Sequence, residues 1–327
     1  MARRKQKKSK AAFIIILLII LACIVGVWYF SGDSTTHPKE STPAQTVTPT
    51  VVPTQTPAPT QIATPVSTPV ASSGKELKIH FINIGQGDAI LLTYDGKNAM
   101  VDAGKSTKEA AKSEVAIDTH LNKIDGLEWL LATHQDSDHI GLARHVMDSE
   151  KTDMFYDNGN TADTYTYTKL MTYISDNNIN YKILSTGDTI NDWDNVKISV
   201  VSSAPTGGKD LNDDSIVLLV EYGNTKIALT GDISKDVESE IGKRLGDIDI
   251  LKVAHHGSKS SSSSSFLNSV KPEVSVISVG ENSYGHPTNE AIDRLDDYGD
   301  VYRTDEFGCV EVVVTDSGYT VQHCEWT

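Results

Sequence analysis

An α+β fold, in which two mixed β-sheets pack together with helices outside, is the fold class that residues 75–327 predict. Early in this region, short apolar runs such as "LKIHFIN" (77–83) and "DAILLT" (88–93) follow one another across tight turns. Such runs are typical of antiparallel hairpins. Further along, amphipathic segments separate the strand-like runs, as helices do when they cover the faces of sheets.

Each element is predicted from its own pattern. Strands are expected where apolar runs are bounded by turn-forming residues, at 77–83, 88–93, 97–102, 128–133, 195–202, 215–222, 225–230, 248–254 and 274–279. Helices are expected where the apolar spacing changes to three and four, at 107–122, 139–148, 163–177, 234–244 and 288–297. In the first helix, Ala111, Val115 and Leu121 lie roughly on one face. The serine run at 260–265 is expected to be a loop.

The chain before this domain begins with a predicted membrane anchor. Residues 1–10 carry six Lys or Arg and no acidic residue, and residues 11–30 form an uncharged apolar run. A run of about 20 apolar residues is long enough to span a bilayer, and its basic flank favours the cytoplasmic side. We therefore expect a single-pass protein of the cell membrane with a basic cytoplasmic flank and an extracytoplasmic domain.

Two alternatives to an uncleaved anchor stay open. The stretch "ILAC" at Cys23 is similar to a bacterial lipoprotein box, and a cleaved signal peptide also combines basic and apolar parts. Leu21 and the apolar residues after Cys23 favour a continuous span, and "GVWYFSG" is a poor cleavage site. Residues 31–74 contain 8 of the 11 prolines, alternating with Thr, Ser, Val and Ala. Because this composition cannot form a core, we expect a disordered, extended linker.

The charge of residues 75–327 restricts the substrates that the domain can attract. This region has 22 Lys or Arg against 42 Asp or Glu, a net charge of −20. Such a surface repels polyanions at long range and disfavours a broad nucleic-acid interface, although bound divalent cations would reverse the sign locally. We therefore expect a short substrate or one strand end to enter a metal-lined cleft. The sequence gives no sign of an obligate protein partner.

Two cysteines flank a predicted hairpin near the end of the sequence. "CVEVVVTDSGYTVQHC" is typical of two strands about a "DSG" turn. With a loop of two or four residues, Cys309 falls directly opposite Cys324. Outside the cell we expect a disulfide between them, and two free, buried thiols are the alternative.

Four potential metal ligands crowd into six positions after an apolar strand. The stretch "LLATHQDSDHIGL" contains His134, Asp136, Asp138 and His139. Holding four ionisable side chains beside a buried strand costs free energy unless a partner compensates them. Imidazole and carboxylate together suit Zn²⁺, Mn²⁺ or iron, and the thiolates of a structural zinc site are missing. We therefore predict a metal-binding loop.

The same design recurs at the ends of other apolar strands. Asp102 closes "AMVDAG", Asp232 follows "IALTG", and His255 and His256 follow "ILKVA". If these strand ends share one edge, three histidines and three aspartates would form two adjacent cation sites with a shared carboxylate. Further polar residues lie beside apolar strands and are weaker candidates: Asn212, Asp213 and Asp214 before "SIVLLV", and Gln86 and Asp88 in "GQGD".

These motifs, in this order, resemble the metallo-β-lactamase superfamily. "THQDSDHIG", "VDAG", "TGD" and "HHGS" carry the likeness. With "NIGQGDAILL", "NDDSIVL" and "YGHPTNE", the chain looks most similar to the metallo-β-lactamase domain of ComEC competence proteins and their free-standing relatives, over roughly 77–310. The resemblance implies an αββα sandwich and a hydrolytic site with two divalent metal ions.

The resemblance also implies metal ligands residue by residue. His134 and Asp136 match ligands of a first metal in the family. Asp138 and His139 match ligands of a second metal. The bridging carboxylate matches Asp232, and the last histidine ligand matches one of two residues, His255 or His256. Asp136 stands where most members have a histidine, which favours Mn²⁺ as well as Zn²⁺.

Around these ligands the resemblance implies a supporting set. Asp102 matches the residue that supports the metal-binding loop, and "NDDS" replaces the usual third-motif histidine. Asn212 or Asp213 would contact metal there, or the first metal would be weakly held. Apart from the resemblance, Asp88 and Gln86 are expected to be turn or supporting residues, with a catalytic role as the alternative. His286 in "GHP" is a candidate proton donor or substrate contact, with a turn-stabilising role as its alternative.

The chemistry that follows is metal-dependent hydrolysis. Two bound cations generate hydroxide near neutral pH and neutralise charge on a phosphoryl or carbonyl oxygen, while Asp138 can orient the nucleophile. The resemblance favours a phosphodiesterase or nuclease-like activity. A hydrolase of another bond (amide, lactone, thioester or wall phosphoester) is the alternative, and an inactive metal-bound binding module is disfavoured by the intact ligand set.

Overall fold

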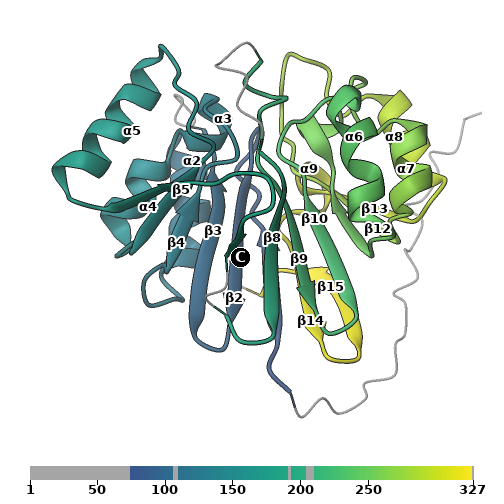
Figure 1. The fold of residues 1–327 in the computed structure, drawn as a ribbon, viewed down its shortest axis with the longest axis horizontal. Helices are drawn as coiled ribbons and strands as arrows, with labels where there is room; N and C mark the ends of the chain where they lie inside the picture. The colour runs from purple at the N-terminus through teal and green to yellow at the C-terminus, as the bar shows by residue number, and fades with distance from the viewer. Residues whose placement is uncertain (1–73, 106–109, 191–192, 204–209, 326–327) are drawn as a thin grey trace, which may run out of the picture. The chain divides into compact units, whose positions relative to one another are not determined.

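Two mixed β-sheets form the centre of the described part of the chain, and helices cover their outer faces (Figure 1). The structure is a computed structural model that describes residues 74–105, 110–190, 193–203 and 210–325. Buried apolar side chains from both sheets form one shared core, so the sheets pack face to face. This mixed α/β sandwich is the architecture that the sequence predicts.

The eight-stranded sheet has an antiparallel half and a parallel half. Its order is β15-β14-β1-β2-β3-β4-β5-β6, antiparallel as far as β3 and parallel beyond it. Asp95 and Gly96 join β2 to β3 with positive φ, the backbone of a two-residue hairpin turn, so the early hairpins are confirmed. The strands are β1 (Leu77–Phe81), β2 (Ala89–Tyr94), β3 (Lys97–Ala103), β4 (Trp129–Leu131), β5 (Met154–Asp157), β6 (Asn180–Ile183), β14 (Val310–Thr315) and β15 (Gly318–His323).

The seven-stranded sheet is built in the same way. Its order is β13-β12-β11-β10-β9-β8-β7, with β7 to β10 antiparallel and β10 to β13 parallel. In each sheet, neighbouring parallel strands end at the same edge, which brings the loops after β3, β4, β10 and β11 together. The strands are β7 (Thr189–Ile190), β8 (Val196–Ser202), β9 (Val217–Tyr222), β10 (Thr225–Leu229), β11 (Ile250–Lys252), β12 (Val274–Ile277) and β13 (Asp300–Arg303).

The helices bury one face each against a sheet. Those of the first half cover the eight-stranded sheet, and those of the second half cover the seven-stranded sheet. The first group is α2 (Ala110–Leu121), α3 (Ser137–Ile140), α4 (Ala143–Ser149) and α5 (Tyr165–Asp176). The second group is α6 (Lys235–Leu245), the short η1 (Ala254–Gly257), α7 (Ser264–Val270), α8 (Asn289–Asp296) and α9 (Thr304–Phe307).

The helix predicted at 139–148 is two helices, α3 and α4. The break follows from tertiary hydrogen bonds: the backbone N–H of Gly141 donates to Gly104 O at 2.7 Å, and that of Leu142 donates to Ala103 O at 3.0 Å. These donors are therefore lost to a continuous helix. The break ties the start of α4 to the end of β3, next to the predicted metal ligands.

The buried face of α2 differs from the predicted one. Leu121 is buried, but Ala111 and Val115 are exposed, and the inward positions are Ser113, Ile117 and His120. Two of these are polar, and their side chains bind backbone carbonyls: Ser113 donates to Ile84 O, and His120 Nδ1 to Ala116 O. Because two residues on the inner face are polar, the spacing of apolar residues in the sequence does not reveal which face of the helix is buried.

Part of the serine run predicted as loop belongs to α7. Ser263 caps this helix, because its side chain accepts from the backbone N–H of Phe266. The helix buries Phe266, Leu267 and Val270 against the second sheet. Residues 260–263 are loop, as expected.

The C-terminal hairpin matches its prediction. Thr315 pairs with Gly318, so the loop has two residues, and Cys309 and Cys324 form a disulfide. The predicted anchor at 11–30 and the linker at 31–74 lie outside the described residues, apart from Gly74. Among the described residues, no helix is both long and apolar enough to cross a membrane.

Candidate metal centre

The burst "HQDSDH" (134–139) covers the end of the loop after β4 and the first residues of α3, and Asp102 holds this metal-binding loop in place. The buried Asp102 carboxylate accepts from the Thr133 backbone N–H and from the Thr133 hydroxyl, both at 2.8 Å. It also lies 2.8 Å from His139 Nδ1. One carboxylate at the end of β3 thus fixes both the start of the loop and the orientation of a predicted ligand.

Three buried histidines gather around Asp232, and two of them direct Nε2 towards its carboxylate. His139 Nε2 lies 3.3 Å and His256 Nε2 lies 3.4 Å from Asp232 Oδ2. His134 brings a ligand atom within 4.8 Å of His139 and Asp232. The three Nε2 atoms are buried and make no hydrogen bond within the described residues.

The opposite ring atoms determine what these Nε2 atoms offer. His139 Nδ1 donates to the Asp102 carboxylate and His256 Nδ1 donates to Ser278 O at 2.8 Å. In the neutral tautomers that these bonds select, each Nε2 carries a lone pair, and both lone pairs face the Asp232 carboxylate. Such an arrangement is repulsive unless a cation lies between them, and a divalent metal ion fits this donor set.

The pKa shifts of His139 and Asp232 also indicate that positive charge is stabilised between them. Burial lowers the pKa of His139, but Asp232 and Asp102 outweigh it and raise that pKa well above its ordinary value. Burial would raise the pKa of Asp232, but His256 and His139 hold it well below its ordinary range. Without a metal, the cluster would have to retain a proton where a cation fits.

Two further aspartates complete the cluster on its exposed side. Asp138 Oδ2 lies 3.7 Å from His256 Nε2, and Asp136 Oδ2 lies 3.8 Å from His134 Nε2. Their side chains are 20 % and 46 % exposed, whereas His134 is fully buried. The cluster therefore opens to solvent on the aspartate side, where a substrate can approach.

Comparison with known proteins agrees with this geometry. The sequence profile of the metallo-beta-lactamase superfamily matches residues 82–281, which include every predicted metal ligand. The chain belongs to the metallo-β-lactamase superfamily. As a member, it is a metal-dependent hydrolase.

Relatives of known name show which members of the superfamily this chain is similar to. Recombination protein 2 of Haemophilus influenzae is 30% identical over 225 residues, 68% of this chain and 26% of that protein. ComE operon protein 3 of Bacillus subtilis is 27% identical over 255 residues, 72% of this chain and 33% of that protein. The chain thus matches a quarter to a third of these relatives, and the ComEC-like resemblance is confirmed. Among solved structures, Igni18, a metallo hydrolase from Ignicoccus hospitalis, has 13% identity and a TM-score of 0.49, covering 73% of this chain and 98% of that one.

The metallo-β-lactamase centre of this chain has two unequal halves. One half gathers Asp138, His139, His256 and Asp232, and the other has His134, Asp136 and Asp232. In the "NDDS" stretch, Ser215 places its hydroxyl 3.3 Å from His134 Nδ1. The same hydroxyl accepts from the Asp232 backbone N–H at 3.2 Å. Ser215 supports both halves and supplies no imidazole.

The other residues of "NDDS" lie outside the ligand groups. Asp213 Oδ1 accepts from the Ser234 backbone N–H at 2.9 Å, which ties its loop to the start of α6. The Asn212 backbone N–H donates to Asp210 Oδ1 at 3.1 Å. Asp214 is buried and accepts from Asn160 Nδ2 at 2.6 Å. These contacts hold the loop in which Ser215 sits.

The two adjacent histidines of "HHG" have different positions. His256 is buried in the cluster, whereas His255 is half-buried, with its ring centroid 5.4 Å from that of His286. Both residues have positive φ, so consecutive side chains leave the backbone in different directions. Burial lowers the pKa of His286, and the nearby His255 and His256 lower it further. His286 is therefore neutral near pH 7, beside the cluster and outside its ligand groups.

A lysine that sequence reasoning missed lies beneath the metal ligands. Lys252 is fully buried at the end of β11, where its ammonium group contacts the Asp88 carboxylate and donates to Gly231 O at 3.2 Å. Burial would lower the pKa of Lys252, but Asp88 and Asp232 outweigh it and raise that pKa. In the sequence, a lysine inside the apolar run "ILKVA" could have indicated a buried lysine with an acidic partner.

Asp88 links this lysine to the histidines. Its carboxylate oxygens lie 3.6 Å from His256 Nδ1 and 3.7 Å from His139 Nδ1. Its backbone N–H donates to Asp138 O at 3.1 Å, and the preceding Gly87 has no room for a Cβ, which would lie 2.5 Å from Asp138 O. The glycine thus lets the "GQGD" loop pack directly on the metal-binding loop.

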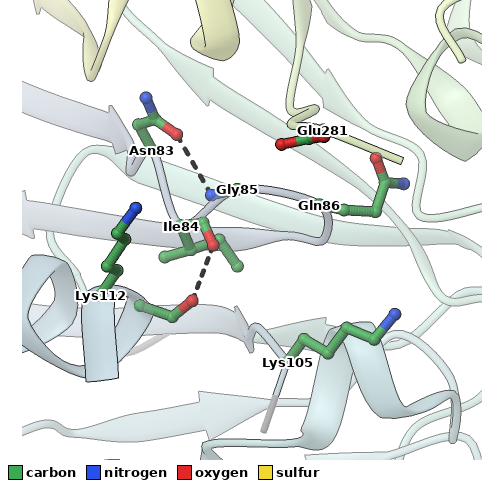
Figure 2. Close-up of a pocket in the computed structure, with 8 residues that line it drawn as sticks. Asn83, Ile84, Gly85, Gln86, Lys105, Lys112 and Glu281 are labelled. Atoms are coloured by element: carbon green, nitrogen blue, oxygen red, sulfur yellow. Dashed lines mark hydrogen bonds between the residues drawn. The ribbon is translucent and has the colours of Figure 1, made fainter. Parts of the chain in front are cut away.

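A pocket of about 500 Å³ lies beside this loop (Figure 2). Gln86, two residues before Asp88, lines it together with Glu281, and Lys105 and Lys112 provide two cations. Ser113 donates to Ile84 O at 2.7 Å and fixes α2 against the pocket wall. The two lysines outnumber Glu281, so the charged side chains of this pocket sum to a positive charge on a domain whose net charge is −20.

Proposed function

We propose that this chain is a membrane-anchored, extracytoplasmic phosphodiesterase that acts on short or single-stranded nucleic acid with two divalent ions, Zn²⁺ or Mn²⁺. The observation that carries the substrate class is the pocket of Lys105 and Lys112, which is lined by the start of the "GQGD" loop that packs on the metal-binding loop. A phosphate neighbouring the scissile one would neutralise these two lysines. The names of the competence and recombination relatives agree with a nucleic-acid substrate.

Each residue of the centre then has a task in the reaction. When bound, the metal ions supply an activated hydroxide and neutralise charge on the phosphoryl oxygens. Asp138 is 20 % exposed, so it can orient the attacking hydroxide from the solvent side. His286, whose pKa is lowered, can accept a proton beside the cluster, and Asp102, Ser215 and Ser278 keep the histidine rings in their ligating orientation.

The proposed location rests on the segment before the domain. Residues 11–30 would anchor the chain, residues 1–10 would remain in the cytoplasm, and residues 31–74 would hold the domain away from the membrane. The Cys309–Cys324 disulfide supports an oxidising compartment outside the cytoplasm.

Hydrolysis of another bond is the second candidate. The net charge of −20 favours it, because an amide, lactone or thioester substrate is not repelled as a polyanion is. The pocket lysines distinguish the two candidates, since a neutral substrate gains nothing from them.

The test compares substrates on the purified full-length chain with added Mn²⁺ or Zn²⁺. We expect cleavage of a labelled single-stranded oligonucleotide, slower cleavage of a long duplex, and no comparable turnover of a thioester or a β-lactam. Lys105→Gln with Lys112→Gln should raise KM for the oligonucleotide about 10-fold, whereas Lys243→Gln, an exposed control on α6, should not. Preferred turnover of the neutral substrates would contradict the proposal.

Salt dependence provides an independent check. Because two lysines contact about two phosphates, the logarithm of affinity should fall with the logarithm of salt concentration with a slope no steeper than about −2. A much steeper slope would indicate a broad basic interface elsewhere and would contradict the proposed binding mode.

A further inference from the structure

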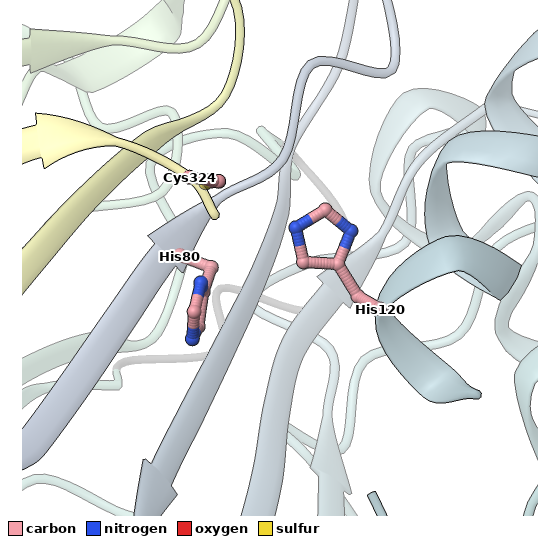
Figure 3. Close-up of side chains that lie close together, drawn as sticks. All are labelled: His80, His120 and Cys324. Carbon is pink, nitrogen blue, oxygen red and sulfur yellow. The ribbon is translucent and has the colours of Figure 1, made fainter. Parts of the chain in front are cut away.

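A second histidine cluster lies away from the catalytic centre, on the outer face of the eight-stranded sheet. Figure 3 shows His80 of β1, His120 at the end of α2, and Cys324 after β15 lying close together. One potential ligand atom of each lies within 4.8 Å of the others. Cys309, the disulfide partner of Cys324, places its Sγ 3.4 Å from His120 Nε2. We refer to these four residues as the Cys–His cluster.

The imidazole rings of His80 and His120 are neutral, which is the form that ligates a metal. His120 Nδ1 lies 2.9 Å from Ala116 O, and a carbonyl only accepts, so Nδ1 carries the proton and Nε2 offers its lone pair to the sulfur side. His80 Nδ1 lies 3.2 Å from the Glu311 carboxylate. A histidine that ligates a metal commonly holds its second nitrogen on a backbone carbonyl, as His120 does. Burial is the main cause that lowers the pKa of both rings, that of His80 to about 3.

We propose that the Cys–His cluster is a redox-gated zinc site, in which reduced Cys309 and Cys324 join His80 and His120 to bind one Zn²⁺. Two thiolates and two imidazoles form a tetrahedral donor set that zinc prefers, with Zn–S near 2.3 Å and Zn–N about 2.0–2.1 Å. Adjacent ligand atoms in such a tetrahedron lie about 3.3–3.8 Å apart. The 3.4 Å between Cys309 Sγ and His120 Nε2 is of this size.

The chemistry of the switch balances with a dithiol reductant. The reductant transfers two electrons and two protons to the Cys309–Cys324 disulfide and becomes a disulfide itself. The S–S bond breaks and two thiols form. Zinc then displaces the two thiol protons as the S–Zn bonds form.

Reductant and metal have a route to the cluster. A cavity of about 500 Å³ is lined by Cys309 and His120, together with His323 and Gly308 from the C-terminal hairpin. The disulfide is otherwise buried, with 3 % and 2 % of its cysteines exposed. Zinc would fasten the hairpin to β1 and α2 when the disulfide no longer closes it, so the two states stabilise the same element.

The test uses Co²⁺ as a spectroscopic probe for thiolate ligation. The full-length chain carries Cys23→Ser, so that Cys309 and Cys324 are its only cysteines, and it is examined oxidised and after reduction with a dithiol. Because the catalytic centre has no cysteine, a cobalt–thiolate charge-transfer band reports only on the Cys–His cluster. We expect the band in the reduced chain, none in the oxidised chain, and its loss when one equivalent of Zn²⁺ displaces the cobalt.

Variants separate ligation from folding. His120→Ala and His80→Ala should each weaken zinc binding by the reduced chain at least about 10-fold, while His145→Ala, which alters a half-exposed histidine paired with Asp118, should leave it unchanged. Metal retained at the catalytic centre shows that each variant is folded. A reduced chain without the band, or a band that persists at full strength in both histidine variants, would overturn the proposal.

Discussion

Two histidine clusters in the described part of the chain use similar residues in opposite surroundings. The metal centre collects three histidines with aspartates that are partly exposed, at the edge where strands of both sheets end. The Cys–His cluster has two histidines and a disulfide, buried under a helix on the outside of one sheet. Carboxylates at an open edge suit a metal that must also bind water and substrate, whereas thiolates in a closed site suit a structural metal. The difference teaches that the surroundings, more than the histidines, decide which cluster does chemistry.

The largest expected effect concerns the open cluster. Asp138→Ala removes a proposed ligand and the group proposed to orient the nucleophile, so turnover should fall by more than the roughly 100-fold typical of changes outside the ligand shell. Steady-state kinetics with saturating Mn²⁺ measure the effect. Asp148→Ala, an exposed aspartate paired with Arg144, is the matched control and should retain activity. Equal activity in both variants would show that the cluster with the exposed aspartates is not the catalytic one.

The next effect concerns the lysine under the metal centre. Lys252→Met should lower the free energy of unfolding by roughly 3–5 kcal/mol, because the buried Asp88 carboxylate loses its ammonium partner. Urea denaturation of the metal-free chain measures this change. Lys197→Met removes an exposed pair with Glu221 and should cost at most about 1 kcal/mol. Comparable costs for the two variants would show that Lys252 is not required for the stability of the centre.

Reduction of the disulfide tests the closed cluster. Opening a covalent loop between residues 15 apart should lower the free energy of unfolding by about 3 kcal/mol without zinc. Turnover of the folded chain should be unchanged, because the cluster lies outside the catalytic centre. Denaturation and activity assays on the same reduced sample distinguish the two quantities. Lost turnover in a reduced chain that is still folded would couple the clusters and contradict their independence.

The smallest effect comes from the residue that supports the metal-binding loop. Asp102→Ala removes the acceptor of His139 Nδ1 and of Thr133, so metal affinity should weaken about 10- to 100-fold. A chelator competition assay measures this change. Asp118→Ala, which removes a half-exposed acceptor from His145, is the control. Unaltered affinity in Asp102→Ala would show that the loop keeps its shape without this carboxylate.

The sequence predicted the hairpins and the gathering of candidate ligands at strand ends because both leave local patterns. Apolar runs mark β1 to β3, and a polar residue after a strand end marks Asp232 and His256 as well as the burst itself. It could not choose between His255 and His256, since both follow the same strand and only the backbone geometry separates them.

Features that depend on tertiary contacts were not predictable. The break between α3 and α4 comes from hydrogen bonds to Ala103 and Gly104, more than 35 residues earlier. Lys252 gains its role from Asp88, which is distant in sequence, and β6 is an exposed edge strand of only four residues, too short a pattern to predict. Ser215 is a small polar residue whose importance appears only beside His134.

The central claim, that cations compensate the burst after β4 and cleave phosphodiesters, is tested most directly by one titration. The full-length chain is stripped of metal, titrated with Mn²⁺ or Zn²⁺, and assayed on bis(p-nitrophenyl) phosphate beside Asp138→Ala. The account predicts turnover that rises with bound metal in the native chain and is absent from the variant. Stoichiometric metal binding without turnover, or turnover that persists in the variant, would contradict it.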